Sequence, residues 1–313
     1  MNEQQKSQRG QEMPHYTEEE ARAYFESRRW PNGVHCAQCD SRNCYELAGT
    51  GHRRGLYQCR DCRGQFTVTV GTVMVDSHLP LSTWAKAFHY MATSKKGVSA
   101  LFLMRSLGLG SYRTAWHLAH RIREAMKGPI EADTTPLEGI VEVDETYVGG
   151  KFSKGRGCKD KSVVVSLVER GGKGRKRSVV MERVTGANLR ATIKQQTTEA
   201  AEIQTDCSAL YNSVKKRNKH ARVNHDAGEY VRYRLDGSTV TTNTVEGSFS
   251  LLKRGIMGQF HSVSKKHLHR YCVEFDARWN LRGLSDVERR DEIVKGAEGR
   301  YLPYKTPIAR LAL

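Results

Sequence analysis

An α/β fold is predicted from the sequence: a mixed five-stranded sheet with helices, preceded by a small metal-stabilised β domain and a helical segment. Three observations predict it: two Cys-x-x-Cys pairs near the N-terminus, helix-period apolar stripes between residues 79 and 127, and short apolar strands alternating with helices from residue 141 onward. A chain of 313 residues is long enough for two or three domains. The boundaries we expect are an N-terminal tail and helix at 1–30, a β ribbon at 31–76, a helical segment at 77–128, a sheet domain at 137–282 and a C-terminal tail at 283–313.

The charge balance indicates a polyanionic partner. Lysine and arginine number 51 against 34 acids, a formal charge of +17, which favours nucleic acid, with a membrane surface as the weaker alternative. The sequence has no apolar run of the roughly 18 to 20 residues that span a bilayer, and its first residues are polar. We therefore expect a soluble cytoplasmic protein, associated with the nucleoid, whose cysteines are reduced.

Four of the eight cysteines have the spacing of a zinc site. Cys36 and Cys39 form one pair, Cys59 and Cys62 the other, and 19 residues separate the pairs. Four thiolates at this spacing are typical of a tetrahedral Zn²⁺ site on two turns of a small ribbon, with no open position for a substrate. The alternative is two coincidental pairs of buried cysteines.

The helical segment is similar in layout to a helix-turn-helix. Helices are predicted from Ser99 to Leu107 and from Ser111 to Lys127, joined by a glycine-containing turn. Arg113 and Arg121 lie on one face of the second helix, where they are candidates for DNA contact. An ordinary helical hairpin with a solvated basic face is the alternative.

The first strand of the sheet domain carries an acid in its middle. Val141 and Val143 are expected to enter a core, whereas Glu142, Asp144 and Thr146 share the other face. Two further strands complete an antiparallel meander, and a helix then leads to a short strand ending at Asp206. Ligands of open α/β sheets gather at the carboxyl ends of strands, so Asp206 is a second candidate. Ordinary solvated acids are the alternative for the first strand. A helix is predicted from Ala209 to Lys216.

Basic residues cluster in two glycine-rich stretches between residues 151 and 177. Such loops allow close approach to a phosphate backbone, although solvated loops have the same composition. The candidates for DNA contact here are Lys151, Lys154, Arg156, Arg175 and Lys176.

A later amphipathic helix supplies the third acid. Val245, Phe249, Leu252 and Ile256 form its apolar stripe, and Thr241 or Thr242 is the expected N-cap. A second stripe combines Asn243, Glu246 and Lys253, so one face presents an amide, a carboxylate and a cation. A solvated Glu-Lys face is the alternative.

The predicted element order, β-β-β-α-β-α-β-α, is that of a ribonuclease H-like domain. In that order Asp144, Asp206 and Glu246 can converge although they are distant in sequence. Carboxylates suit a hard ion such as Mg²⁺, and a pair of these ions supports phosphoryl transfer without a nucleophilic side chain.

Several motifs resemble those of a known family. They are the ribbon cysteines, Val-Glu-Val-Asp-Glu-Thr-Tyr-Val-Gly-Gly from 141, Thr-Asp at 205, Asn-His-x-x-Gly-Glu-Tyr-Val from 224, and Asn-Thr-Val-Glu-Gly-Ser-Phe-Ser-x-Leu-Lys-Arg-Gly from 243. Over residues 17–282 the chain resembles the zinc-ribbon branch of DDE insertion-sequence transposases. The resemblance departs at 235–241, where the family has a histidine just before the asparagine motif.

The resemblance implies Mg²⁺ or Mn²⁺ bound by Asp144, Asp206 and Glu246, with Asn243 able to share the third position. It also implies that Lys253, with Arg254 beside it, lies near DNA. The expected activity is cleavage of element ends in double-stranded DNA and strand transfer into a target, by a homo-oligomer assembled on DNA. The alternatives are a non-catalytic zinc-containing regulator derived from a transposase and a ribonuclease H-like nuclease that cleaves without joining.

Overall fold

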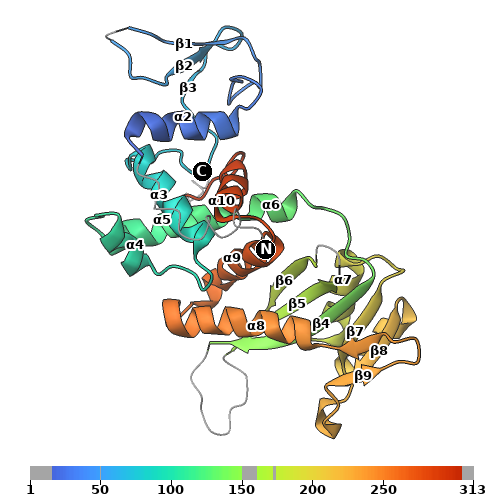
Figure 1. Cartoon of the computed structure of the whole chain (residues 1–313). Helices are drawn as coiled ribbons and strands as arrows, with labels where there is room; N and C mark the ends of the chain where they lie inside the picture. The colour runs from blue at the N-terminus through green and yellow to red at the C-terminus, as the bar shows by residue number, and fades with distance from the viewer. Residues whose placement is uncertain (1–15, 50, 150–160, 172–173, 305–313) are drawn as a thin grey trace, which may run out of the picture. The chain divides into compact units, whose positions relative to one another are not determined.

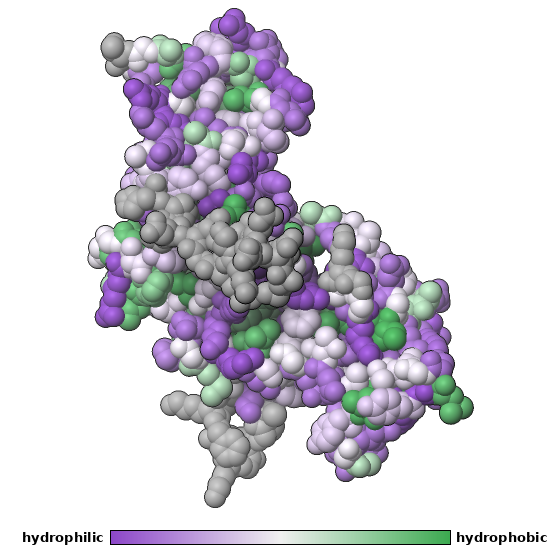
Figure 2. All heavy atoms as spheres, viewed as in Figure 1, coloured by the Kyte–Doolittle hydropathy of each residue, from purple (hydrophilic) through white to green (hydrophobic). Residues whose placement is uncertain are grey.

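The chain forms two compact units (Figure 1). The computed structural model describes residues 16–49, 51–149, 161–171 and 174–304. The first unit comprises Met1–Ser94, Val98–Pro129 and Leu284–Leu313, and the second comprises Lys95–Gly97 and Ile130–Gly283. Within the described ranges, no helix combines the length and the apolar character that crossing a bilayer requires. Hydrophilic side chains cover most of the face in Figure 2, in keeping with the large number of charged residues.

The first unit combines a three-stranded ribbon with helices. Helix α2 (Glu18–Arg29) begins at Thr17, whose hydroxyl accepts a hydrogen bond from the Glu20 N–H in a capping box. The ribbon is antiparallel, in the order β1-β2-β3. Its strands are β1 (Cys44–Glu46), β2 (Tyr57–Cys59) and β3 (Gln65–Phe66), and the helices that follow are α3 (Leu81–Thr93), α4 (Ala100–Ser106), α5 (Tyr112–Ala125) and the short α6 (Lys127–Glu131).

The C-terminal segment is more than a tail. Helix α10 (Asp286–Lys295) lies in it, begins with a capping box at Ser285, and packs against α2 and α3 in the first unit. Its buried residues Arg290, Ile293 and Val294 belong to the interior of that unit.

The second unit has the predicted mixed sheet. Five strands follow the order β6-β5-β4-β7-β8; the first three are antiparallel, and β7 and β8 run parallel to β4. This is the ribonuclease H-like arrangement, so the predicted fold class is confirmed. The strands are β4 (Ile140–Val148), β5 (Ser162–Arg170), β6 (Lys176–Met181), β7 (Glu202–Asp206) and β8 (Lys219–Val223).

Helices cover both faces of the sheet. On one face, α7 (Gly186–Gln196) contributes Leu189 and Ile193 to a core that includes Val141 and Val143, as predicted for those two valines. On the other face, α8 (Asn243–Gly255) and α9 (Leu268–Asn280) pack on a core that includes Val148. Side chains of β4 therefore alternate between the α7 face and the α8 face.

One local expectation was wrong. Residues 209–216 form two single 3-10 turns, Ala209–Tyr211 and Val214–Lys216, because Asn212 and Ser213 between them favour turns over helix. Thr242 is the N-cap residue of α8, as expected, although its side chain makes no capping hydrogen bond. A short hairpin, β9 (Val231–Tyr233) and β10 (Thr239–Thr241), leads into α8.

Candidate active site and metal centre

Asp144 and Asp206 lie at matching positions on neighbouring strands. In the parallel β4–β7 ladder, Ile140 lies opposite Glu202 and Glu142 opposite Gln204. The paired positions end there, and Asp144 and Asp206 each follow the last pair by two residues. Because neighbouring strands lie about 4.8 Å apart, the two carboxylates start from adjacent backbone positions.

Both acids face α8. Val141 and Val143 belong to the α7 core and Val148 to the α8 core, so alternation turns Asp144 toward α8. Ile203 lies in the α7 core, and Asp206, three residues later, points the opposite way for the same reason.

Glu246 lies in the first turn of α8 and is held from two sides. The Thr242 hydroxyl donates to its Oε1 at 2.7 Å, and His225 Nε2 lies 3.2 Å from the same oxygen. His225 comes from the 3-10 turn His225–Ala227, which follows the end of β8. The Glu246 side chain stays 44% exposed, so the carboxylate remains accessible.

The clustering of acids is visible in the electrostatics of Asp144. Burial, together with the charges of Glu145, Asp206 and Glu246, raises the pKa of Asp144 to about 7, against a hydrogen bond from the Glu145 N–H. The carboxylates of Glu145, Asp206 and Glu246 are close enough to raise the pKa of Asp144, so the four acids together form a site with surplus negative charge. Binding of a cation would relieve that repulsion.

Three residues near these acids were not singled out from the sequence. The Glu145 carboxylate accepts a hydrogen bond from the buried Tyr211 hydroxyl. Burial raises the pKa of Glu145 against that hydrogen bond, and the charge of Asp206 adds to the rise. His225 is the third. His225 comes just after the end of strand β8, as Asp206 comes at the end of β7. The same positional argument that selected Asp206 from the sequence would therefore also have selected His225.

Asn243, Lys253 and Arg254 all lie exposed on α8. Asn243 is the first residue of the helix, and its N–H donates to Thr241 Oγ1 at 3.1 Å. Lys253 comes two turns after Glu246, about 10 Å along the helix axis. The amide, the carboxylate and the cation therefore follow one another along α8.

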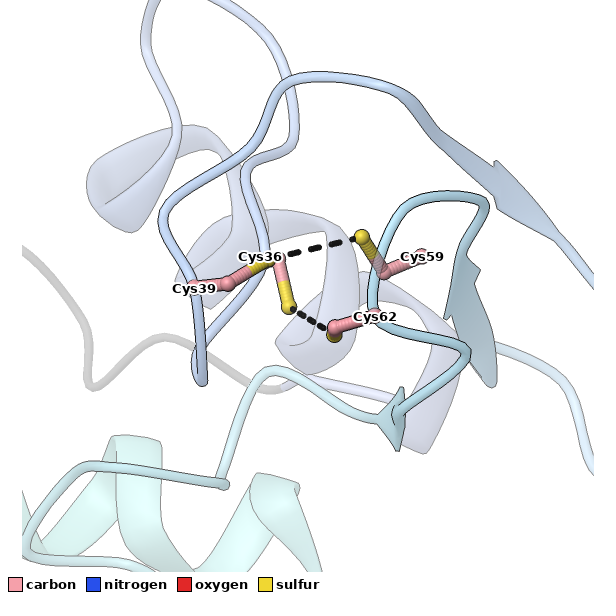
Figure 3. Close-up of side chains that lie close together, drawn as sticks. All are labelled: Cys36, Cys39, Cys59 and Cys62. Carbon is pink, nitrogen blue, oxygen red and sulfur yellow. Dashed lines mark hydrogen bonds between the residues drawn. The ribbon is translucent and has the colours of Figure 1, made fainter.

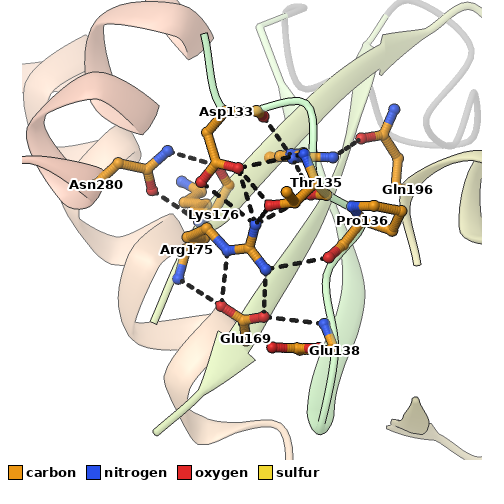
Figure 4. Close-up of polar contacts among 10 residues, drawn as sticks. Asp133, Thr135, Pro136, Glu138, Glu169, Arg175, Lys176, Gln196 and Asn280 are labelled. Atoms are coloured by element: carbon orange, nitrogen blue, oxygen red, sulfur yellow. Dashed lines mark hydrogen bonds and ion pairs between the residues drawn. The ribbon is translucent and has the colours of Figure 1, made fainter. Parts of the chain in front are cut away.

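Two of the expected DNA contacts are corrected by the structure, and Figure 4 shows the partners of one of them, Arg175. The Lys176 side chain is buried, with the residue 1% exposed, and its ammonium pairs with Asp276 at 3.3 Å. Arg175 pairs with Glu169 at 2.7 Å and with Asp133 at 3.1 Å. Both cations are neutralised inside the second unit and are not available to phosphates.

Arg121 is corrected in the same way. It is 6% exposed, donates to the Val75 carbonyl, and lies over the Trp84 ring with 5.3 Å between its guanidinium carbon and the ring centroid. Arg113 is exposed near the start of α5 and lines a cavity of about 710 Å³ that also touches Arg121 and His117. Lys151, Lys154 and Arg156 lie outside the described residues.

The four ribbon cysteines converge (Figure 3). Their sulfur atoms all lie within 4.8 Å of one another, and the Cys36–Cys62 and Cys39–Cys59 sulfur pairs are 3.6 Å apart. A tetrahedron with Zn–S bonds of about 2.3 Å has sulfur–sulfur edges of about 3.8 Å, so the cluster fits a zinc ion.

The two cysteine turns have the same backbone design. The N–H of Cys36 donates to the Ser41 carbonyl, and the N–H of Cys59 donates to the Gly64 carbonyl, the same number of residues ahead. The residue after each second cysteine, Asp40 or Arg63, has a left-handed backbone with φ of 60° or 62°. The backbone N–H of Cys62 lowers the pKa of the Cys59 thiol, whereas the neighbouring thiols raise the pKa of Cys39, so the four sulfurs share protons as one group.

A ribonuclease H-like sheet with acids turned toward one helix, preceded by a four-cysteine ribbon, defines a transposase of the DDE type. Residues 136–280 match the ISXO2-like transposase domain, and residues 16–65 match the transposase zinc-ribbon domain. The chain belongs to the zinc-ribbon branch of DDE insertion-sequence transposases, as its motifs indicated. The family implies that the chain acts on DNA, and it supports a structural Zn²⁺ in the cysteine cluster. Comparison with curated proteins gives no match.

Proposed function

We propose that this chain cleaves DNA at the ends of an insertion sequence in a Mg²⁺-dependent reaction and joins the cut strand to target DNA. The observation that supports the proposal is the β4–β7 register, which pairs Glu142 with Gln204, two residues before Asp144 and Asp206, beside the face that the Glu246 helix covers. The raised pKa of Asp144 supports it, because surplus negative charge is what a divalent cation neutralises.

The donor atoms suit Mg²⁺ or Mn²⁺. Asp144, Asp206 and Glu246 would hold the ions, with the Asn243 amide oxygen close to the third position, and oxygen donors are those that these hard ions prefer. When bound, the ions would stabilise the charge that develops during in-line displacement at phosphorus. Thr242 and His225 orient the Glu246 carboxylate, each from within hydrogen-bonding distance.

Exposed cations of the chain would hold the DNA. Lys253 and Arg254 lie on the helix that carries Glu246 and would neutralise phosphates near the site. Residues 1–128, with Arg113 among them, would recognise the element ends. Assembly of several copies on DNA belongs to the same proposal.

Nicking of a duplex that carries an element end tests the proposal. Asp144→Asn and Asp206→Asn should each abolish Mg²⁺-dependent nicking and leave DNA binding intact. A joined product in a strand-transfer assay would separate a transposase from a nuclease that only cleaves. Wild-type protein that binds the ends but never nicks them would refute the proposal in favour of a non-catalytic regulator.

A further inference from the structure

Glu142 is a buried carboxylate that caps helix α8 from a distant strand. It is 0% exposed, and its Oε2 accepts hydrogen bonds from the Thr244 N–H at 2.8 Å and the Val245 N–H at 2.9 Å. The Thr244 hydroxyl donates to Oε1 at 2.9 Å. The second and third residues of a helix have N–H groups without intrahelical partners, so Glu142 satisfies the donors that the Thr242 side chain leaves open.

Arg170 extends this contact across the sheet. Its Nε lies 3.4 Å from Glu142 Oε1, and another of its nitrogens donates to Gln204 Oε1 at 3.0 Å. The same Gln204 oxygen accepts a hydrogen bond from the Thr241 N–H at 2.9 Å, in the strand that leads into α8. One polar network therefore joins β4, β5, β7, β10 and α8.

Three members of the network stand next to the proposed metal ligands at a constant spacing. Glu142 precedes Asp144 by two residues on the same face of β4, Gln204 precedes Asp206 in the same way on β7, and Thr244 precedes Glu246 by two residues on α8. On the two strands this spacing puts the network residue and the acid on the same face. On α8 the contact fixes the first turn, in which Glu246 also lies.

We propose that Glu142 is a positioning residue that sets the separation of Glu246 from Asp144 and Asp206 and thereby the affinity of the site for Mg²⁺. The inference rests on the proposed function, since it takes these three acids as the metal ligands. Glu142 itself stays buried behind them and touches neither DNA nor metal. It acts through the start of α8, whose N–H groups it holds.

Isothermal titration calorimetry of Mg²⁺ binding to the full-length protein tests the inference, because it measures metal affinity directly and does not depend on catalysis. Glu142→Ala should raise the Mg²⁺ dissociation constant about 10-fold or more, the range found for groups that orient metal ligands. Thr244→Val, which keeps Glu142 but loses the hydroxyl, should raise it in the same direction, and Thr244→Ser should restore a value close to that of the wild type. The Thr244 pair keeps the test decisive if Glu142→Ala does not fold.

A matched control separates positioning from stability. Glu169 is a buried carboxylate on the opposite face of the same sheet, and Glu169→Gln loses an ion pair with Arg175. This variant should melt at a lower temperature yet bind Mg²⁺ with unchanged affinity. The inference would be overturned if folded Glu142→Ala and Thr244→Val bind Mg²⁺ with unchanged affinity. If Asp144→Asn fails to bind Mg²⁺ in the same experiment, the proposed function stands and only the inference falls. Wild-type protein that binds no Mg²⁺ would overturn the proposed function and the inference with it.

Discussion

Replacing Asp144 by asparagine is expected to have two opposite effects: loss of metal-dependent nicking, and a gain in stability of the Mg²⁺-free protein at pH 8. Burial and the charges of Glu145, Asp206 and Glu246 raise the pKa of Asp144 from 3.8 to about 7. The folded state thus holds this proton more tightly than the unfolded state does. Stability therefore falls as the pH rises from about 4 to about 7 and stays lower above that range.

The size of the gain follows from that difference in pKa. One unit corresponds to about 1.36 kcal/mol, so the upper bound is roughly 4 kcal/mol. Asp144 keeps some contact with water, and the effective dielectric of such sites is high, so about 1 to 2 kcal/mol is expected. In a protein of 313 residues that raises the melting temperature by about 1.5 to 3 °C.

Thermal unfolding at pH 8 and pH 5, in buffer freed of Mg²⁺ without a chelator that would strip zinc, measures the effect. Asp144→Asn should melt above the wild type at pH 8, and the gap should shrink at pH 5. Glu202→Gln is the control, because it should lower the melting temperature at pH 8, where Asp144→Asn should raise it. Although burial opposes it, hydrogen bonds from Arg234, Gln204 and Lys219 lower the pKa of Glu202 to about 2, so the ionised form stabilises the protein at pH 8.

The reasoning about Asp144 is refuted if its asparagine variant melts at or below the wild type at pH 8 while Glu202→Gln is destabilised as expected. Retention of Mg²⁺-dependent nicking by Asp144→Asn would refute the assignment of this residue as a metal ligand. The two outcomes are independent, because the first concerns the Mg²⁺-free protein.

Four further predictions concern the metal site and other parts of the molecule. Saturating Mg²⁺ should raise the melting temperature more at pH 8 than at pH 5.5, because the metal competes with the proton on Asp144; a rise that does not depend on pH would contradict this. Cys59→Ser should lose zinc, measured by elemental analysis, and lose amide protection across residues 36–66, and a wild-type protein without zinc would be the contrary result. Lys176→Ala should destabilise the protein by about 3 kcal/mol, since it leaves Asp276 buried without its cation, with DNA affinity unchanged. Lys253→Ala should leave stability unchanged and reduce the slope of the salt dependence of DNA binding by about one ion. Lost stability in Lys253→Ala together with weaker DNA binding in Lys176→Ala would contradict the surface role of Lys253 and the buried role of Lys176.

Features of the fold that depend on local pattern were predictable from the sequence. The alternation around Val141 and Val143 predicts which face of β4 enters the α7 core, and both valines are buried there. The cysteine spacing predicts the cluster because two tight turns bring their own sulfurs together, whatever the rest of the chain does. The antiparallel meander was predictable because consecutive short strands without a helix between them pair as neighbours, and β4, β5 and β6 do so.

Features that depend on partners distant in sequence were not predictable. The sequence places Arg175 and Lys176 in a basic cluster, but their orientation depends on Asp133 and Asp276, which lie about 40 and 100 residues away. A count of charges cannot distinguish a lysine on the surface from one neutralised inside the sheet unit. The same holds for Arg121, whose carbonyl partner belongs to Val75.

Two of the three acids of β4, Glu142 and Asp144, show how distant partners decide the role of a residue. Glu142 and Asp144 share one face of one strand, and the sequence alone treats them alike. A buried carboxylate is costly unless donors surround it. Glu142 has three donors from the start of α8 together with Arg170, and it is satisfied by the protein itself. For Asp144, within the part of the chain that the structure describes, the donor is the Glu145 N–H at 2.8 Å, and the groups around it are other carboxylates. Among the described residues, Asp144 therefore has less compensation by donors than Glu142 has, and this difference supports the proposal that Asp144 is the acid that binds a cation.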